Sequence, residues 1–243
     1  MYKAMLRMEK GVFVMEENTL KSSLHTLTML LEKHYGSKAV LLIDEYDVPL
    51  DKAFHAGFYE KMISLIRTML SKSLKSNSAL KFAVLTGCLH ISKESIFTGL
   101  NNLKIYSITD VQFDEYFGFT DAEVKEMLEY YNLSSKYDEI KEWYDGYMFG
   151  NVAVYCPWDV MMYGYELKTN PSAKPKAYWS NTSSNSVVKR FIHKATKRTQ
   201  SEIEQLIAGE AVWKEVYQDL TYNELDKTID HLWSVLFMTG YLT

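Results

Sequence analysis

The spacing of apolar residues changes several times along the first half of the chain, and each spacing predicts an element. Residues 18–35 repeat leucines at helical intervals, at positions Leu20, Leu24, Leu27 and Leu31. This spacing predicts one amphipathic helix, with Asn18 as its N-cap and Gly36 as its terminator. Residues 51–75 predict a second helix, with core-facing positions Phe58, Met62, Leu65, Ile66 and Met69.

Three short apolar runs predict β-strands. They read AVLLID, KFAVLT and KIYSIT, at residues 39–44, 81–86 and 104–109. The first run carries bulky residues on both faces, which is typical of a strand buried on both sides in a parallel sheet. A helix between the first two strands makes a βαβ unit, whose strands are parallel. We therefore expect all three strands to be parallel neighbours in one sheet.

The second half of the chain is predicted to be mostly helical from Asp114 onward. The segment Thr120–Glu123 has the form of a capping box, and Pro157 suits the first turn of a helix. Residues 146–155 predict a turn or small hairpin, and residues 178–185 predict a turn around a buried Trp179. Further helices are expected over residues 136–144, 185–198, 200–208 and 223–238. The change of pattern places a domain boundary near residues 110–114.

Composition narrows the class of protein. The chain has 243 residues, of which 47% are hydrophobic, and this allows a well-filled core. A net charge of −4 does not favour nucleic-acid binding by bulk electrostatics. The two cysteines, Cys88 and Cys156, lie far apart and indicate reduced thiols in a cytoplasmic protein. No apolar run approaches the ~20 residues of a membrane span.

Two carboxylates, Asp44 and Glu45, follow directly after the first strand, at the edge where open α/β sheets bind ligands. In ATPases such a strand is Walker B, where the Asp holds Mg²⁺ beside the phosphates and a following Glu acts on the attacking water. Thr86, at the end of the next strand, suits a sensor of the γ-phosphate. The alternatives are a surface turn with solvated carboxylates, and a hydroxyl that only caps a strand end.

Other polar residues near this edge admit two interpretations. Asp47 either joins a metal shell or starts a turn, and its position before Pro49 favours the turn. His90 and Lys93, in the loop after Thr86, either contact a phosphate or a partner subunit, or lie in solvent, which is favoured. The sequence contains no GxxxxGK[ST] phosphate loop.

Six segments of the chain follow one another in an order that is typical of one family. They read LLIDEYDVPL, LTGCLHISKESIFTGLNNL, YFGFTDAEV, WYDGYMFG, VYCPWDVMMY and YWSNTSSN. From about residue 20 to its C-terminus, the chain resembles the bacterial AAA-ATPase-like family. Members usually carry a Walker A loop in an N-terminal segment, and many carry a C-terminal PD-(D/E)XK nuclease-like domain.

The resemblance implies a fold and a set of roles. Residues 1–112 would form part of an α/β P-loop NTPase core of the additional-strand class, with a parallel sheet, and residues 113–243 a mostly α-helical lid-like region. Asp44 would bind Mg²⁺ and with it ATP, Glu45 would position water, and Thr86 would sense the γ-phosphate. His90 stands where the family has an arginine, and is the second candidate for contact with the nucleotide.

These features lead to one leading hypothesis and two alternatives. We expect a fragment of a cytoplasmic Mg²⁺-dependent ATPase, with weak or absent ATP binding on its own. Because the missing segment would supply further strands, an exposed sheet edge or apolar face and self-association are expected. The first alternative is a degenerate, non-catalytic interaction module. The second, nucleic-acid processing, rests only on the family's nuclease-like domain, since we expect no basic stripe in this chain.

Overall fold

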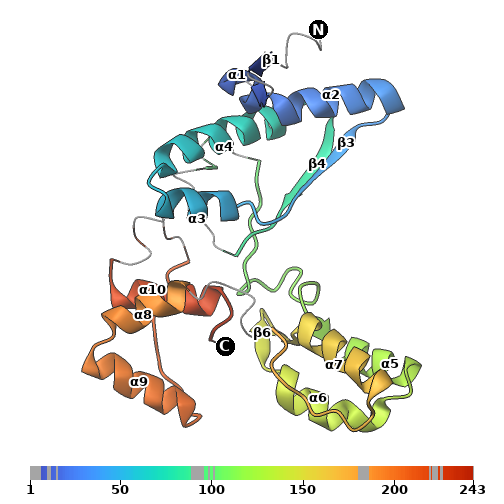
Figure 1. Cartoon of the computed structure of the whole chain (residues 1–243), viewed down its shortest axis with the longest axis vertical. Helices are drawn as coiled ribbons and strands as arrows, with labels where there is room; N and C mark the ends of the chain where they lie inside the picture. Colours follow the sequence, from blue (N-terminus) through green and yellow to red (C-terminus); the bar gives the residue numbers. More distant parts are fainter. Residues whose placement is uncertain are drawn as a thin grey trace. The chain divides into compact units, whose positions relative to one another are not determined.

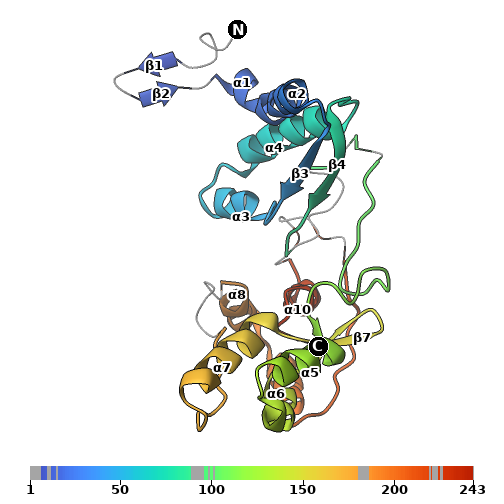
Figure 2. The same cartoon turned by 90° about the vertical axis from the view of Figure 1, so that its right-hand side faces the viewer.

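The chain folds as a mixed α/β protein that divides into two compact units (Figures 1 and 2). Unit 1 comprises Met1–Lys104 with Glu215–His231, and unit 2 comprises Ile105–Lys214 with Leu232–Thr243. The computed structural model describes residues 7–9, 12–14, 16–88, 96–97, 99–100, 102–179, 186–218, 220, 224 and 227–242. The functional division into residues 1–112 and 113–243 stays a prediction.

Among the described residues before position 104, unit 1 contains two small sheets and four helices. In chain order the elements are β1 (Arg7–Glu9), β2 (Val12–Val14), α1 (Glu17–Lys21), α2 (Ser23–Tyr35), β3 (Ala39–Ile43), α3 (Val48–His55), α4 (Tyr59–Leu74) and β4 (Leu80–Leu85). Strands β1 and β2 form an antiparallel pair. Strands β3 and β4 are parallel, with Val40 opposite Phe82 and Ile43 opposite Leu85. The predicted parallel pairing of the first two strands is therefore confirmed.

The third predicted strand, residues 104–109, is wrong. No strand forms there, and the segment runs into a turn closed by its own side chains. The Asp110 carboxylate accepts the backbone N–H of Ser107 at 2.7 Å, and the Ser107 and Thr109 hydroxyls are hydrogen-bonded at 2.8 Å. Such local side-chain bonds offer the backbone an alternative to a sheet ladder. The described part of the parallel sheet thus consists of β3 and β4.

The predicted helix over residues 18–35 is two helices that break at Ser22. Glu16, rather than Asn18, precedes the first helix, while Gly36 ends the second in the left-handed conformation with φ 66°, as predicted. The predicted leucine face is not the buried one, because Leu27 is 51% exposed and Thr28 is buried.

The predicted helix over residues 51–75 is also two helices, α3 and α4, separated by a turn at Gly57, whose φ is 77°. Ile66 is buried as predicted, and the other buried apolar positions of α4 lie one residue later than the predicted face or beyond it: Tyr59, Ile63, Leu70 and Leu74. Phe58, expected in the core, is 43% exposed. Asp47 is the N-cap of α3, and Asp51 lies in the first turn of that helix.

One face of the β3–β4 pair is open, contrary to the prediction of a strand buried on both sides. Helices α2 and α4 pack against the pair on one side (Figures 1 and 2). On the other face Leu42 is 70% exposed, and the neighbouring side chains are 44–49% exposed: Val40, Phe82 and Val84. We call these four residues the open sheet face. Contiguous apolar surface of this kind marks an interaction site or an aggregation liability.

We expect the isolated chain to self-associate through the open sheet face. Leu42→Lys places a charge at its most exposed position and should shift the chain toward monomer, as measured by light scattering over a concentration series. Ile207→Lys is the matched control, because Ile207 is 82% exposed but lies on unit 2. A monomeric unaltered chain at high concentration would contradict this prediction.

Unit 2 is mostly helical around a small antiparallel sheet. Its elements are β5 (Phe119–Thr120), α5 (Asp121–Tyr130), the 3₁₀ turn η2 (Ser134–Lys136), α6 (Tyr137–Tyr144), β6 (Tyr147–Phe149), β7 (Val152–Tyr155), α7 (Pro157–Thr169), α8 (Ser186–Lys194), α9 (Lys197–Ile207) and α10 (Ile229–Met238), which starts in unit 1. The sheet order is β5-β7-β6. The hairpin near residues 146–155 and the capping box of Thr120 and Glu123 are confirmed.

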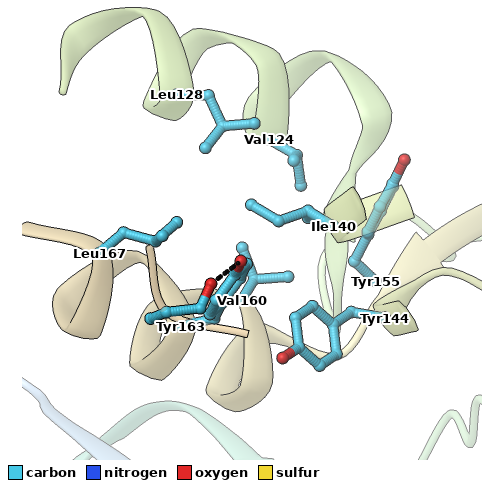
Figure 3. Packing of buried hydrophobic residues seen from close by; sticks show 9 residues of the cluster. Val124, Leu128, Ile140, Tyr144, Tyr155, Val160, Tyr163 and Leu167 are labelled. Carbon is cyan, nitrogen blue, oxygen red and sulfur yellow. Dashed lines mark hydrogen bonds between the residues drawn. The ribbon is translucent and has the colours of Figure 1, made fainter. Parts of the chain in front are cut away.

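The core of unit 2 lies between α5, α6, α7 and β7 (Figure 3). Its most deeply buried members are Val124, Leu128, Ile140, Tyr155, Val160, Tyr163 and Leu167. Tyrosine hydroxyls at the edge of this core donate to carboxylates, as Tyr155 does to Asp121 at 2.8 Å and Tyr163 does to Glu139 at 2.8 Å. A buried tyrosine usually needs such a partner for its polar end.

Trp179, predicted to be buried, is 56% exposed. Its backbone N–H, rather than its ring, is the anchor, because it donates to the Asp159 carboxylate at 3.0 Å. Its ring meets the half-exposed Trp158 ring edge-on, with centroids 5.9 Å apart. Across the described residues, no helix is both long enough and apolar enough to cross a bilayer.

Candidate functional site

The parallel register of β3 and β4 brings their carboxyl ends to the same edge. Asp44 follows β3 and Thr86 follows β4. Backbone pairing continues past both strands, since Thr86 N–H donates to Ile43 O at 2.9 Å and Tyr46 N–H donates to Thr86 O at 3.0 Å. Asp44 and Thr86 are therefore held as neighbours by the backbone of the sheet itself.

The side chains of Asp44 and Thr86 are directly hydrogen-bonded. The Thr86 hydroxyl donates to Asp44 Oδ1, and the same oxygen accepts the backbone N–H of Glu45 at 3.0 Å. A carboxylate held from two sides loses much of its rotational freedom, which favours a fixed ligand position over a mobile surface acid. The predicted pairing of these two strand ends is thus observed, and the alternative of a threonine that only caps its own strand does not describe the contact.

Glu45 adopts a backbone conformation that non-glycine residues seldom occupy. Its φ is 52°, and its side chain is exposed. The left-handed region costs energy for a residue with a Cβ, and such residues gather at functional sites. The carbonyl of Glu45 accepts the N–H of Val48 at 3.1 Å, which closes the turn that leads into α3.

Asp47 starts α3, as predicted for a turn residue, and is only 5% exposed. Its carbonyl accepts the N–H groups of Leu50 and Asp51, each at 3.0 Å. A Cβ on Gly87 would lie 2.7 Å from Asp47 Oδ1 and 2.7 Å from Tyr46 Cε1. A glycine after β4 is therefore needed for the loop after β3 to pack this closely, and Asp47 and Gly87 belong to the same edge of the sheet.

Cys88 reports the negative character of this edge. Desolvation by the surrounding protein, followed by the charges of Asp47, Glu45 and Asp44, raises the pKa of its thiol. The thiol therefore stays protonated at neutral pH and is a poor nucleophile. Asp44, Glu45 and Asp47 thus all lie near enough to Cys88 to act on its thiol, so the three carboxylates gather at this end of the sheet.

Some predicted site residues are not placed. His90, the second candidate for contact with the nucleotide, lies outside the described residues, and so does Lys93. Within the described ranges there is no group of three or more potential ligands of a protein-only metal site. Mg²⁺ at nucleotide sites needs less, because one or two carboxylates act together with substrate phosphates and water. The residues present fit that limited role.

Sequence reasoning missed two residues of this edge. It assigned no role to Gly87 beyond that of a small residue, and it did not foresee that Asp47 would be buried. A glycine two residues after a strand, next to a parallel strand that also ends in polar residues, is the signal that indicates close packing of the two loops. Whether a glycine is needed at this position depends on which loop packs against it, and the sequence of one strand does not reveal that loop.

A comparison with known proteins finds a family match in the first part of the chain. The family model described as "Predicted AAA-ATPase" matches residues 2–97, a stretch that contains β3, β4 and the whole edge described above. This match gives the chain a coarse ATPase-like resemblance confined to unit 1.

A longer bacterial protein is similar over most of the chain. The "Uncharacterized protein in vnfD 5'region" of Azotobacter chroococcum mcd 1 is 28% identical over 209 residues, which cover 86% of this chain. The same alignment covers 37% of that protein, so the chain spans little more than a third of this relative's length. No solved structure matches the chain at a significant level. The chain is thus similar to predicted AAA-ATPases in its first part, and to a much longer protein across most of its length.

Proposed function

We propose that the β3–β4 edge is the Mg²⁺- and water-facing part of an ATP site, in a protein that couples ATP hydrolysis to conformational change. The observation that carries this proposal is the hydrogen bond from the Thr86 hydroxyl to Asp44 at the ends of two parallel strands. It joins a Walker B-type acid to the polar residue of the neighbouring strand. The family match over residues 2–97 supports a P-loop NTPase core of the additional-strand class.

Each residue of the edge has a distinct role in this proposal. Asp44 holds Mg²⁺, which would neutralise charge on the β- and γ-phosphates. Glu45, one residue further on and in a different backbone conformation, orients the attacking water and accepts its proton. Thr86 keeps Asp44 in position and responds to the γ-phosphate through its hydroxyl. His90 would contact the nucleotide from the loop after β4.

The phosphate-binding part of the site is proposed to come from another segment of polypeptide. The 243 residues contain no GxxxxGK[ST] element, whose backbone N–H groups and lysine hold the phosphates. The longer relative, of which this chain matches 37%, is compatible with such a segment elsewhere in a related protein. In this proposal, unit 2 serves as the lid-like region of the complete ATPase.

We expect the chain alone to bind ATP weakly or not at all. One carboxylate and one hydroxyl supply no phosphate cradle, so most of the binding energy of a P-loop is missing. Calorimetry with Mg·ATP tests this expectation, with a titration of Mg²⁺ alone as the control. A dissociation constant in the micromolar range would contradict it, and would mean that other residues of this chain form the cradle.

A second candidate function is a non-catalytic interaction module derived from an ATPase. The open sheet face favours it, because an apolar face is suited to a partner surface. One experiment distinguishes the two functions. If the protein is an ATPase, joining this chain to a phosphate-binding segment should give ATP hydrolysis that depends on Asp44. If the protein is an interaction module, the Asp44→Asn variant of the same joined protein should bind its partner as tightly as the unaltered protein does.

A further inference from the structure

Basic residues are distributed very unevenly along this acidic chain. From Leu167 to Ser201 the sequence contains no aspartate or glutamate, while the whole chain carries a net charge of −4. The same stretch contains eight basic residues: Lys168, Lys174, Lys176, Lys189, Arg190, Lys194, Lys197 and Arg198. The expectation that the chain has no basic stripe is therefore wrong, because the total charge hides a strongly basic segment. A segment of this composition suits an anionic partner.

Two lysines near the start of this segment have interaction partners within unit 2. Lys176 is paired with Glu166 at 2.8 Å, and Lys168 lies over the Tyr131 ring at 4.7 Å. These two lysines have partners within unit 2 that account for their positions. Arg198, at the start of α9, is also paired, with Glu202, but its side chain stays 85% exposed and accessible to a ligand.

Helix α8 turns its apolar side inward and a basic side outward. Phe191 is 3% exposed and packs on the Trp233 ring of α10, with centroids 4.8 Å apart. Lys189 and His193, four residues apart, lie on the side of α8 opposite Phe191 and are exposed. The packing of α8 thus fixes the direction in which this basic side faces.

Two more cations follow directly, at the start of α9. Thr196 caps that helix by accepting the N–H of Thr199 at 3.2 Å, which places Lys197 and Arg198 in its first turn. Arg198 is paired with Glu202 at 3.0 Å, and Lys214 reaches the same carboxylate at 2.8 Å. Trp213, next to Lys214, is therefore held beside α9, and its side chain is 94% exposed.

We propose that Lys189, His193, Lys197, Arg198 and Trp213, the α8–α9 basic surface, bind single-stranded nucleic acid. The lysine and arginine side chains contact successive phosphates, a ring N–H of His193 donates to a phosphate oxygen, and the Trp213 ring provides a face on which a base stacks. Binding of single strands typically combines a basic track with exposed aromatic rings. Trp213 directly precedes Lys214, which is paired with Glu202 of α9, and it is 94% exposed, so its ring is accessible to a base.

The structure disfavours an anionic membrane as the partner. A basic helix that lies on a bilayer inserts its apolar side between the lipids. The apolar side of α8 is already occupied, because Phe191 is buried against α10. Among the described side chains of α8, the exposed surface carries Lys189 and His193 together with a single large apolar side chain, Ile192, which is 63% exposed. One apolar residue is a small area to insert into a bilayer, so a phosphate backbone is the better match.

The test uses the full chain and a fluorescently labelled oligothymidylate, with anisotropy measured over a range of salt concentrations. We expect binding that weakens as salt rises, with a log–log slope of about −0.7 for each phosphate contacted. The triple variant K189Q/H193Q/K197Q should weaken binding and make this slope shallower. Trp213→Ala should weaken binding about 5- to 150-fold with little change in slope, because stacking releases no counterions.

The matched control is K33Q/H34Q/K38Q, which makes the same three substitutions at exposed positions of unit 1. It should leave binding unchanged, and circular dichroism should show both triple variants to be folded. Absence of binding at low salt would overturn the proposal, as would equal losses in the two triple variants or an unaffected Trp213→Ala. Stronger binding to phosphatidylserine vesicles than to the oligonucleotide would overturn it as well. None of these readouts depends on ATP hydrolysis.

Discussion

Glu45→Gln should slow ATP turnover about 10²–10⁴-fold when this chain is joined to a phosphate-binding segment, while ATP affinity stays close to that of the unaltered protein. The amide keeps the shape of the side chain but accepts no proton from the attacking water. Glu45 is exposed, and it makes its turn through its backbone rather than its carboxylate. The substitution should therefore leave the fold intact.

Asp44→Asn should act differently, because Asp44 works through the metal. It should weaken the dependence of nucleotide binding on Mg²⁺, and it also changes the group that accepts the Thr86 hydrogen bond. Successive side chains at a strand end point in different directions, so the two acids need not share one ligand. Single-turnover hydrolysis and ATP affinity, measured for each variant, separate the two roles.

The control for both variants is Glu60→Gln, the same change at an exposed position of α4 away from the strand ends. It should behave as the unaltered protein. If Glu45→Gln hydrolyses ATP at the unaltered rate, the proposed catalytic role is wrong. The Asp44–Thr86 contact would then be a structural feature of two strand ends, and the interaction-module function would be favoured.

The second large effect is expected in the core of unit 2. Ile140 is completely buried between α5, α6 and α7, so Ile140→Ala removes apolar surface and leaves a cavity (Figure 3). Such substitutions cost about 2–5 kcal/mol in the free energy of unfolding, depending on how far the neighbours collapse. Denaturant unfolding, followed through the tryptophans of unit 2, measures this cost.

Ile207→Ala is the matched control, since it makes the same change at a position that is 82% exposed. Its effect should stay within about 0.5 kcal/mol, which is usual for surface substitutions. Equal destabilisation by the two variants would mean that the core of unit 2 is not where the structure places it.

Apolar periodicity was enough to predict β3 and β4 but not the segment at 104–109. All three runs contain branched or aromatic residues, and they differ in the hydrogen-bond partners of their backbones. Residues 39–43 and 80–85 find each other as parallel partners. In the third run, Ser107 and Asp110 form hydrogen bonds within the turn and take the backbone out of strand geometry. β-Strand propensity alone does not reveal whether local side-chain hydrogen bonds will replace the backbone pairing of a sheet.

Helix existence was easier to predict than helix orientation. Helix α4 carries apolar residues on adjacent faces, among them Met62 and Ile63, so spacing fits two registers equally well. Tertiary packing selected the face that contains Ile63, Ile66 and Leu70. For the same reason the predicted leucine face of the first helix is largely exposed, because nothing in a single sequence states which neighbour a face will meet.

At the candidate site, the sequence predicted which residues would meet, and the structure added how they are held. Asp44 and Thr86 were expected at one edge because carboxyl ends of parallel strands coincide. Their direct hydrogen bond and the left-handed Glu45 are tertiary results that no local pattern reports. The need for a glycine at position 87 comes from the Asp47 side chain that lies against it, and Asp47 belongs to a different loop.

The division of each unit between distant parts of the chain affects how the protein is made. Unit 1 combines Met1–Lys104 with Glu215–His231, and helix α10 carries the chain on into unit 2. A ribosome adds about 5–20 residues per second, so the first part of unit 1 waits roughly 5–20 s for its second part. During that interval the β3–β4 pair has been synthesised while its unit is incomplete. Nascent chains of this protein therefore have a period in which holdase chaperones can compete with folding, and its length is set by translation speed rather than by the stability of the finished fold.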